Sequence, residues 1–179
     1  MNMKKLMLIV GVLFAAMGVQ TQQLSAQPPQ TPHQTQRQYL SGTGYDDAVE
    51  WEFMVTGGRR AGEWTTIPVP SCWELQGFGT YQYGMQFYGQ ATPPGIANEQ
   101  GVYRYRFHLP AEWENKMVRL VFEGVMTDAT VRINNQRAIR LHQGAFYRFK
   151  TLDDITERFN FGDKENLLEV TVNKESANR

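Results

Sequence analysis

The sequence predicts an all-β domain folded as an antiparallel β-sandwich, and three observations support this prediction. Short segments of alternating apolar and polar residues recur along the chain, as expected for strands with one buried face. Turn-forming residues separate these segments about every 8 to 12 residues, a spacing typical of sandwiches. Almost no stretch has the period of an amphipathic helix. Aromatic residues, which are frequent in strands, make up 12% of the chain.

The length and composition indicate one domain and exclude several classes of function. A chain of 179 residues is too short for a sandwich together with a catalytic barrel of roughly 250 residues. Lys and Arg number 18, as do Asp and Glu, so no basic surplus favours nucleic acid as a partner. The three histidines and the one cysteine are scattered without the spacing of metal ligands. We therefore expect no cofactor or metal, and we expect Cys72 to be a buried small residue.

Residues 1–26 have the pattern of a secretory signal peptide. Lys4 and Lys5 supply a positive region, an apolar run extends from Leu6 to Val19, and Ala26 offers a small residue for cleavage. The alternative is a membrane anchor, but this run gives only about 21 Å of helix against a bilayer core of about 30 Å. The sequence therefore predicts a periplasmic or secreted protein that is free of the membrane once the signal is removed.

A polar segment separates the signal from the folded part of the chain. Residues 27–44 are rich in Gln, Thr and Pro and lack periodic apolar residues over most of their length. Such a segment buries too little surface to offset its ordering entropy, so a flexible linker is expected. The sandwich is predicted to occupy residues 45–179.

The first part of the domain is predicted to contain two strands and a long loop. Apolar residues alternate strictly at the start of 49–55, which predicts an opening strand. The two prolines in 64–70 remove ladder donors and allow only an edge strand. Residues 71–98 are rich in glycine and aromatic residues and fit neither period, so we expect a long ordered loop. Its aromatic side chains either serve a function or only seal a sheet edge.

The next elements have the clearest strand patterns. In residues 101–109 aromatic side chains alternate with two arginines and His108, so His108 is expected to face solvent and not to belong to a catalytic set. A corner at Pro110 to Trp113 leads into residues 117–123. That run is almost continuously apolar, which predicts a strand deep in a sheet.

A hairpin and a last strand complete the predicted sheets. Residues 129–133 and 138–141 are expected to pair through Asn134 and Asn135, which tolerate positive φ. The remaining elements are predicted to be a short strand, a helical turn with a carboxylate near its start, a polar turn and the last strand, at residues 146–150, 153–159, 162–166 and 167–172.

Several acidic residues could form a carboxylate pair for glycoside hydrolysis. Such pairs are about 5 to 10 Å apart and can come from distant parts of a chain, so Glu99, Glu123 and Asp128 are candidates. Glu123 follows a buried strand and Asp128 opens another, so both are predicted to satisfy donors at turns and strand ends. The residues alone leave three classes open: a carbohydrate-binding module, an adhesion or assembly domain, and an accessory domain of an enzyme.

Several motifs between Glu50 and Asn178 occur in a recognisable order. They are Ile67-Pro68-Val69-Pro70-Ser71-Cys72-Trp73, Gly101-Val102-Tyr103-Arg104-Tyr105-Arg106-Phe107, Phe122-Glu123-Gly124-Val125, Val131-Arg132-Ile133-Asn134, and Glu165-Asn166-Leu167-Leu168-Glu169-Val170. Together they resemble the N-terminal jelly-roll, or sugar-binding, domain of the β-galactosidases of glycoside hydrolase family 2. Asn135 stands where that family usually has glycine.

The resemblance implies a jelly-roll sandwich like the galactose-binding domains, incomplete at its C-terminal end. It also implies a non-catalytic sugar-binding and scaffold domain of an enzyme that hydrolyses terminal β-D-galactosyl residues. The family's acid/base and nucleophile glutamates lie in a downstream barrel. The resemblance therefore implies no catalytic residue here, an inactive chain on its own, and two partners, namely a galactoside or other glycan and the catalytic barrel. The oligomeric state stays open.

One residue is implied to contact substrate. Asn98 precedes Gly101-Val102-Tyr103 with the spacing of a loop asparagine that reaches the active-site entrance in galactose-specific relatives. The alternative is a turn residue that caps its own loop.

Two other interpretations remain. In one, the chain is a free-standing carbohydrate-binding module whose loop offers stacking platforms at Trp73, Tyr81, Tyr83 and Tyr88. In the other, the chain is a fragment that folds poorly because open sheet edges and apolar faces lack partners.

Overall fold

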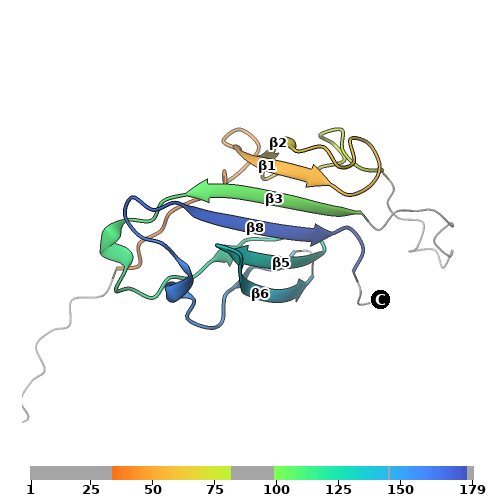
Figure 1. The fold of residues 1–179 in the computed structure, drawn as a ribbon. Helices are drawn as coiled ribbons and strands as arrows, with labels where there is room; N and C mark the ends of the chain where they lie inside the picture. Colours follow the sequence, from red (N-terminus) through yellow and green to blue (C-terminus); the bar gives the residue numbers. More distant parts are fainter. Residues whose placement is uncertain (1–33, 82–98, 145, 177–179) are drawn as a thin grey trace, which may run out of the picture. The chain divides into compact units, whose positions relative to one another are not determined.

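The computed structural model describes residues 34–81, 99–144 and 146–176, and this part of the chain is all-β (Figure 1). The predicted signal peptide and the first seven residues of the predicted linker lie outside the described residues. No helix in the described part is long and apolar enough to cross a membrane.

The strands form two antiparallel sheets. The larger sheet has six strands in the order β2-β1-β3-β8-β5-β6, and a two-stranded sheet pairs β4 with β7. The elements are β1 (Val49–Val55), β2 (Thr65–Val69), β3 (Gln100–Phe107), η2 (Ala111–Trp113), β4 (Val121–Phe122), β5 (Asp128–Ile133), β6 (Gln136–Gln143), β7 (Phe149–Lys150), η3 (Thr156–Arg158) and β8 (Asn166–Asn173), where η denotes a short 3-10 helix. The predicted all-β, antiparallel class is confirmed, and the arrangement is consistent with a sandwich.

The segment before β1 contacts the first two strands. It belongs to the compact unit that starts at Gln38. The indole Nε1 of Trp51 donates to the carbonyl of Leu40 at 2.9 Å. The amide of Gly42 donates to the carbonyl of Val69 at 3.0 Å. The segment before β1 is thus tied to β1 and β2 by contacts that its polar composition does not reveal.

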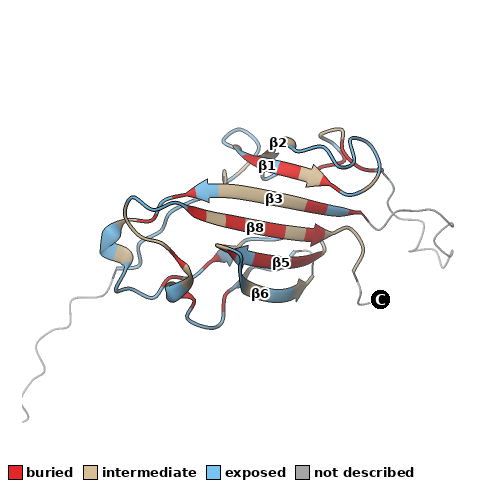
Figure 2. Cartoon of the chain, in the orientation of Figure 1, coloured by how far each residue is buried: buried red, intermediate tan, exposed pale blue. Residues whose placement is uncertain are grey.

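The central strands of the large sheet are β3 and β8, which pair along their whole length (Figure 1). Alternate residues of β8 are buried, and Figure 2 shows this alternation along the strand. The edge strand β6 has no buried residue. The other edge is β2, so the prediction of an edge strand at 64–70 is confirmed, since its prolines need not donate to a further neighbour.

Aromatic side chains fill the core beneath β1 and β3. Trp51 stacks on Tyr105 with ring centroids 5.0 Å apart. Phe53 is fully buried and contacts the rings of Phe78 and Tyr103, with centroids at 5.0 and 4.7 Å. The period-two pattern of the sequence correctly predicted which faces of these strands are buried.

One predicted strand is wrong in extent and position. Residues 117–123 were expected to lie deep in a sheet, but only β4 is a strand, and it pairs with β7 alone. Val118 and Leu120 are buried while Val121 is 44% exposed. The guanidinium of Arg119 donates to the carbonyl of Thr151 at 3.0 Å. The apolar run therefore contributes Val118 and Leu120 to the core, whereas Val121 lies in the small sheet and is exposed to solvent.

The hairpin and the helical turn agree with the sequence. Asn134 and Asn135 have φ of 49° and 65° and connect β5 to β6. The predicted turn at 153–159 contains η3, and the carboxylate of Asp154 accepts the amide of Thr156 at 2.9 Å. His108 is exposed just beyond β3, as expected.

Candidate functional site

The most unusual arrangement of charge lies where β3 begins and β8 ends. Lys174, the residue after β8, places Nζ 3.2 Å from Oε1 of Glu74 and 3.8 Å from Oε2 of Glu99. The three side chains are 7%, 3% and 0% exposed. Two carboxylates and one ammonium group thus share a buried site, which we call the Glu–Lys–Glu cluster.

Backbone groups add further polar contacts to this cluster. The amide of Thr80 donates to Oε2 of Glu99 at 2.9 Å, and the ammonium group of Lys174 donates to the carbonyl of Thr80. The amide of Lys174 donates to the carbonyl of Glu99 at 3.0 Å. The cluster therefore ties the end of β8 to both Thr80 and Glu99, which flank the segment 81–98 in the chain.

Glycines make room for the buried carboxylate of Glu99. A Cβ on Gly79 would lie 2.4 Å from its Oε2, and a Cβ on Gly58 would lie 2.5 Å from its Oε1. Both glycines have positive φ, of 61° and 72°. Arg59 lies between these chain segments and donates from Nη2 to the carbonyl of Glu74 at 3.1 Å. Only glycine combines this backbone geometry with so close an approach.

Two polar side chains, Tyr103 and Cys72, lie close to Glu74 of this cluster. Burial raises the pKa of the Tyr103 hydroxyl, and the negative charge of Glu74 and the thiol of Cys72 raise it further. The thiol of Cys72 lies 3.1 Å from Oε2 of Glu74, at hydrogen-bond distance for sulfur. Cys72 is half-buried. The sequence predicted a buried residue at this position, and the structure shows partial burial only.

The Glu–Lys–Glu cluster joins distant segments of the chain in the interior of the domain. Its carboxylates are buried, and both lie within 4 Å of the Lys174 ammonium group. Among the described residues no group of His, Cys, Asp and Glu could hold a metal ion.

The other two candidate carboxylates, those of Asp128 and Glu123, also have hydrogen-bond or ion-pair partners. Asp128 is 1% exposed and accepts from the hydroxyl of Ser176 at 2.7 Å and from the amide of Gln143 at 3.1 Å. Glu123 is 78% exposed and pairs with Arg148 at 3.4 Å. The strand-end role that the sequence suggested for Asp128 agrees with these contacts.

The residues predicted to contact sugar differ in exposure and in whether the structure describes them. Trp73 is 5% exposed, and its ring packs against Phe53 and Tyr103 in the core, so it cannot offer a free face to a sugar. Tyr81 is 65% exposed. The predictions for Tyr83, Tyr88 and Asn98 lie outside the described residues. The role assigned to Trp73 is corrected because its ring covers Phe53 and lies against the backbone of β3.

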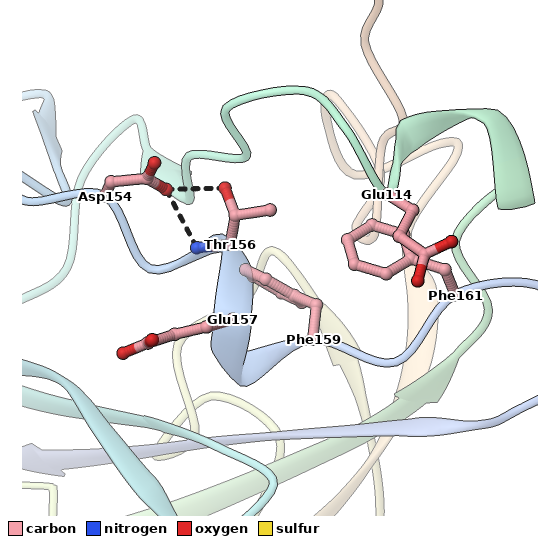
Figure 3. Close-up of a pocket in the computed structure, with 6 residues that line it drawn as sticks. All are labelled: Glu114, Asp154, Thr156, Glu157, Phe159 and Phe161. Atoms are coloured by element: carbon pink, nitrogen blue, oxygen red, sulfur yellow. Dashed lines mark hydrogen bonds between the residues drawn. The ribbon is translucent and has the colours of Figure 1, made fainter.

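A hollow of about 590 Å³ lies elsewhere, at η3 (Figure 3). It is lined by Glu114, Asp154, Thr156, Glu157, Phe159 and Phe161. Figure 3 shows the carboxylate of Asp154 turned toward Thr156, and it accepts hydrogen bonds from the hydroxyl and the backbone amide of that residue. Phe159 belongs to the core. Trp73 and Tyr81, the predicted site residues that the structure describes, do not line this hollow.

Sequence reasoning missed Glu74 and Lys174. Glu74 stands in the irregular aromatic loop and Lys174 in a polar run after the last strand, where charged residues usually face water. Nothing in either local pattern distinguishes a buried charge from an exposed one.

Comparison with known proteins gives a family match over most of the chain. The model of the sugar binding domain of family 2 glycosyl hydrolases matches residues 55–178. A β-galactosidase of Vibrio cholerae is 40% identical over 65 residues, which are 35% of this chain and 6% of that protein. A β-galactosidase of Thermoanaerobacter pseudethanolicus is 37% identical over 70 residues, which are 39% of this chain and 9% of that protein. The chain therefore spans less than a tenth of the length of these curated relatives.

Solved structures include distant likenesses. A β-D-glucuronidase of Dictyoglomus thermophilum has a TM-score of 0.49 and 20% identity, over 71% of this chain and 19% of that chain. A β-glucuronidase of Ruminococcus gnavus in complex with uronic isofagomine has a TM-score of 0.49 and 23% identity, over 72% of this chain and 20% of that chain.

Proposed function

The chain belongs to the sugar-binding domain family of the family 2 glycosyl hydrolases, and on this basis we propose that it is the jelly-roll domain of a β-galactosidase. In this role it is a non-catalytic scaffold and sugar-binding domain of an enzyme that hydrolyses terminal β-D-galactosyl residues. The observation that carries the proposal is the family match over residues 55–178, joined by the local identity to β-galactosidases.

The state of the carboxylates supports a non-catalytic role. A retaining or inverting glycosidase needs two carboxyl groups that flank one open site. Glu74 and Glu99 are instead buried around Lys174, and Asp128 is buried among neutral donors. Glu123 lies on the surface in an exposed ion pair. We therefore assign hydrolysis to the catalytic barrel of the proposed parent enzyme.

The small sheet offers a surface for docking against that barrel. Met117, Val121 and Leu152 are 60%, 44% and 82% exposed. They lie near one another, because Arg119 donates both to the sulfur of Met117 and to the carbonyl of Leu152, and β4 pairs with β7 beside them. Exposed apolar side chains gathered at one place are typical of an interaction site. The partner that the family implies is the remainder of the enzyme.

The sugar contact is assigned to the chain around the Glu–Lys–Glu cluster. Tyr81 is exposed directly after Thr80, and Asn98 directly precedes Glu99. Because Thr80 and Glu99 are fixed by the buried cluster, the cluster gives this part of the chain a rigid base. An amide side chain at Asn98 could donate to and accept from sugar hydroxyls, and Tyr81 could stack on a sugar ring.

Export belongs to the same proposal. Residues 1–26 would be removed as a signal peptide, which places the mature protein in the periplasm or outside the cell. N-terminal sequencing of the protein recovered from the periplasm tests this, with Gln27 as the expected first residue.

The central experiment measures hydrolysis and binding by the same purified chain. We expect no release of nitrophenol from nitrophenyl β-galactoside under conditions in which an intact family 2 β-galactosidase is active. Measurable turnover that copurifies with the chain would contradict the non-catalytic assignment. Titration calorimetry with galactose and galactan oligomers provides the second measurement.

Glycan binding without hydrolysis is also the result expected if the chain is a free-standing carbohydrate-binding module. The exposed ring of Tyr81 is the observation that favours this second candidate. Tight binding to an extended glycan in the absence of any other domain would support the module, whereas no heat with any neutral glycan leaves the scaffold role alone.

A further inference from the structure

A row of polar side chains crosses the outer face of the large sheet. Its members are register partners on neighbouring strands, in the strand order of Figure 1: Thr66 (β2), Glu52 (β1), Arg104 (β3), Glu169 (β8), Arg132 (β5) and Arg137 (β6). The residues on either side of Glu52, Glu169 and Arg132 are buried, and those beside Arg104 are partly buried against the core, so the row lies on the opposite face.

The charges alternate along this row until its last step. Glu169 accepts from Arg104 at 2.8 Å, and both side chains are partly buried. Arg132 then follows Glu169, but the next residue, Arg137, is also positive. Like charges directly opposite each other on paired strands are destabilising. Both arginines are exposed, and neither has a carboxylate within ion-pair distance in the described part of the chain.

A third arginine joins this pair from outside the sheet. Arg158 of η3 donates from its guanidinium to the backbone carbonyl of Arg137. Arg132 donates to the carbonyl of Asn135, two residues before Arg137. Two guanidinium groups thus donate to backbone carbonyls at this hairpin end, where the exposed side chain of Arg137 also begins. Among the described carboxylates, Arg158 too has no ion-pair partner.

The position at a sheet edge limits what the partner can be. Since β6 is an edge strand, its outward backbone groups could in principle pair with a strand of another chain. The carbonyl of Arg137 is already occupied by Arg158, which opposes strand addition at this point. A partner at this point would therefore contact the arginine side chains and not the backbone. Because these side chains lack carboxylate partners among the described residues, the expected partner carries negative charge.

We propose that Arg132, Arg137 and Arg158 bind the anionic group of an acidic saccharide. Guanidinium groups match the planar oxygens of carboxylates and the oxygens of sulfates, and they form paired hydrogen bonds with them. The anionic chemistry follows from the arginines alone. That the ligand is a saccharide rests on the proposed function. The site is distinct from the Glu–Lys–Glu cluster, which lies at the other end of β3 and β8, beside Gln100 and Asn173.

The test uses the whole chain and two double variants. Arg132→Gln with Arg137→Gln removes the site, while Arg60→Gln with Arg148→Gln removes the same charge from exposed ion pairs elsewhere. Oligogalacturonate supplies carboxylates, a sulfated galactan supplies sulfates, and neutral galactan oligomers are the uncharged probe. Titration calorimetry is run at low and at physiological salt, because a charge-based site weakens as salt rises.

We expect the native chain and the control variant to bind at least one of the anionic probes. The Arg132/Arg137 variant should bind about tenfold more weakly or worse, since hydrogen bonds to charged groups are lost. Its thermal midpoint should be equal to or above that of the native chain, because a like-charge pair is removed. This second measurement separates loss of a site from loss of folding.

Three results overturn the inference. They are the absence of binding to both anionic probes, equal binding by the Arg132/Arg137 variant, and an equal loss in the control variant. Failure of the proposed function looks different. In that case the purified chain hydrolyses nitrophenyl β-galactoside, whatever the anionic probes show.

Discussion

Lys174 holds its ammonium nitrogen 3.2 Å from a carboxylate oxygen of Glu74, and both side chains lie in the interior of the domain. Glu74 belongs to the loop after β2, and Lys174 follows the last strand. The ion pair therefore ties the irregular loop to the end of β8. Glu99 shares the same cation, so removing the lysine would leave two carboxylates buried without their counter-charge.

The first prediction concerns this cation. Lys174→Met keeps most of the side-chain volume and removes the charge, and we expect a loss of about 3 to 5 kcal/mol in the free energy of unfolding. Urea denaturation followed by fluorescence measures the change. The matched control is Arg60→Met, which breaks an exposed pair with Glu63 and should cost about 0 to 1 kcal/mol. Equal, small effects in both variants would show that the cluster does not hold the loop.

The second prediction compares two glycines with similar backbone conformations. Gly79 and Gly62 have φ of 61° and 80°, so alanine at either position strains the backbone and lowers the free energy of unfolding by about 1 to 2 kcal/mol. Only at Gly79 would the new Cβ also meet Oε2 of Glu99, at 2.4 Å, whereas nothing lies within 4 Å at Gly62. Gly79→Ala should therefore destabilise the domain clearly more than Gly62→Ala in the same denaturation assay. Equal losses would mean that the buried carboxylate shifts without cost.

The third prediction concerns Asn134 in the β5–β6 turn. Its amide donates to Oδ1 of Asn166 at 2.9 Å and to the carbonyl of Arg158 at 2.8 Å, and it accepts the amide of Leu167 at 2.9 Å. Asn134→Ala leaves these part-buried groups without partners, and we expect a loss of about 2 to 4 kcal/mol. The change is measured by thermal and urea denaturation.

The neighbouring turn residue is the control for that variant. Asn135 also has positive φ, but it is exposed, and only its backbone carbonyl makes a hydrogen bond in the structure. Asn135→Gly should leave stability unchanged or raise it by less than about 1 kcal/mol, because glycine adopts this conformation freely. A loss at Asn135 as large as at Asn134 would contradict the role of the side-chain hydrogen bonds.

The fourth prediction compares two of the described aromatic residues of the loop, Trp73 and Tyr81. Trp73 is 5% exposed and packs on Phe53, so Trp73→Ala should cost about 3 to 5 kcal/mol of stability. Tyr81 is 65% exposed, so Tyr81→Ala should change stability by no more than about 0.5 kcal/mol. Glycan binding, if it uses the loop surface, should fall in the Tyr81 variant at unchanged stability. A stable Trp73 variant that loses binding would reverse these assignments.

The fifth prediction is a pH dependence. Hydrogen bonds from the hydroxyl and the amide of Thr156 hold the pKa of Asp154 below its ordinary value of 3.8. A carboxyl with a lowered folded pKa stabilises the domain above the unfolded pKa, and this contribution is lost as the pH falls through the folded value. We therefore expect the stability difference between the native chain and Asp154→Asn to shrink below about pH 4. The comparison is made by urea denaturation at several pH values.

Asp47 provides an independent comparison for this effect. Its carboxylate accepts the amides of Thr43 and Gly44, and these bonds likewise lower its pKa. Asp47→Asn should show the same direction of change. A stability difference that grows on acidification in either variant would contradict the assignment.

Much of the fold could be predicted from the sequence because it depends on period and on local backbone preference. Alternation placed Trp51 and Phe53 on the buried face of β1, and the prolines placed β2 at an edge. Two asparagines indicated the turn between β5 and β6. The ordered motifs pointed to the family that the comparison then matched over residues 55–178.

Tertiary structure alone decided the features that join distant parts of the chain. Lys174 is buried because it meets Glu74 and Glu99 from other segments, and a charge at the end of a strand carries no sign of such partners. Trp73 became a core residue because Phe53 and Tyr103 lie beneath it, although its loop suggested a surface ring. The sequence by itself determined the family and most of the strands, but not the strand at residues 117–123. Packing between segments determined which charged and aromatic side chains remain available for function, because burial is set by neighbours that are remote in sequence.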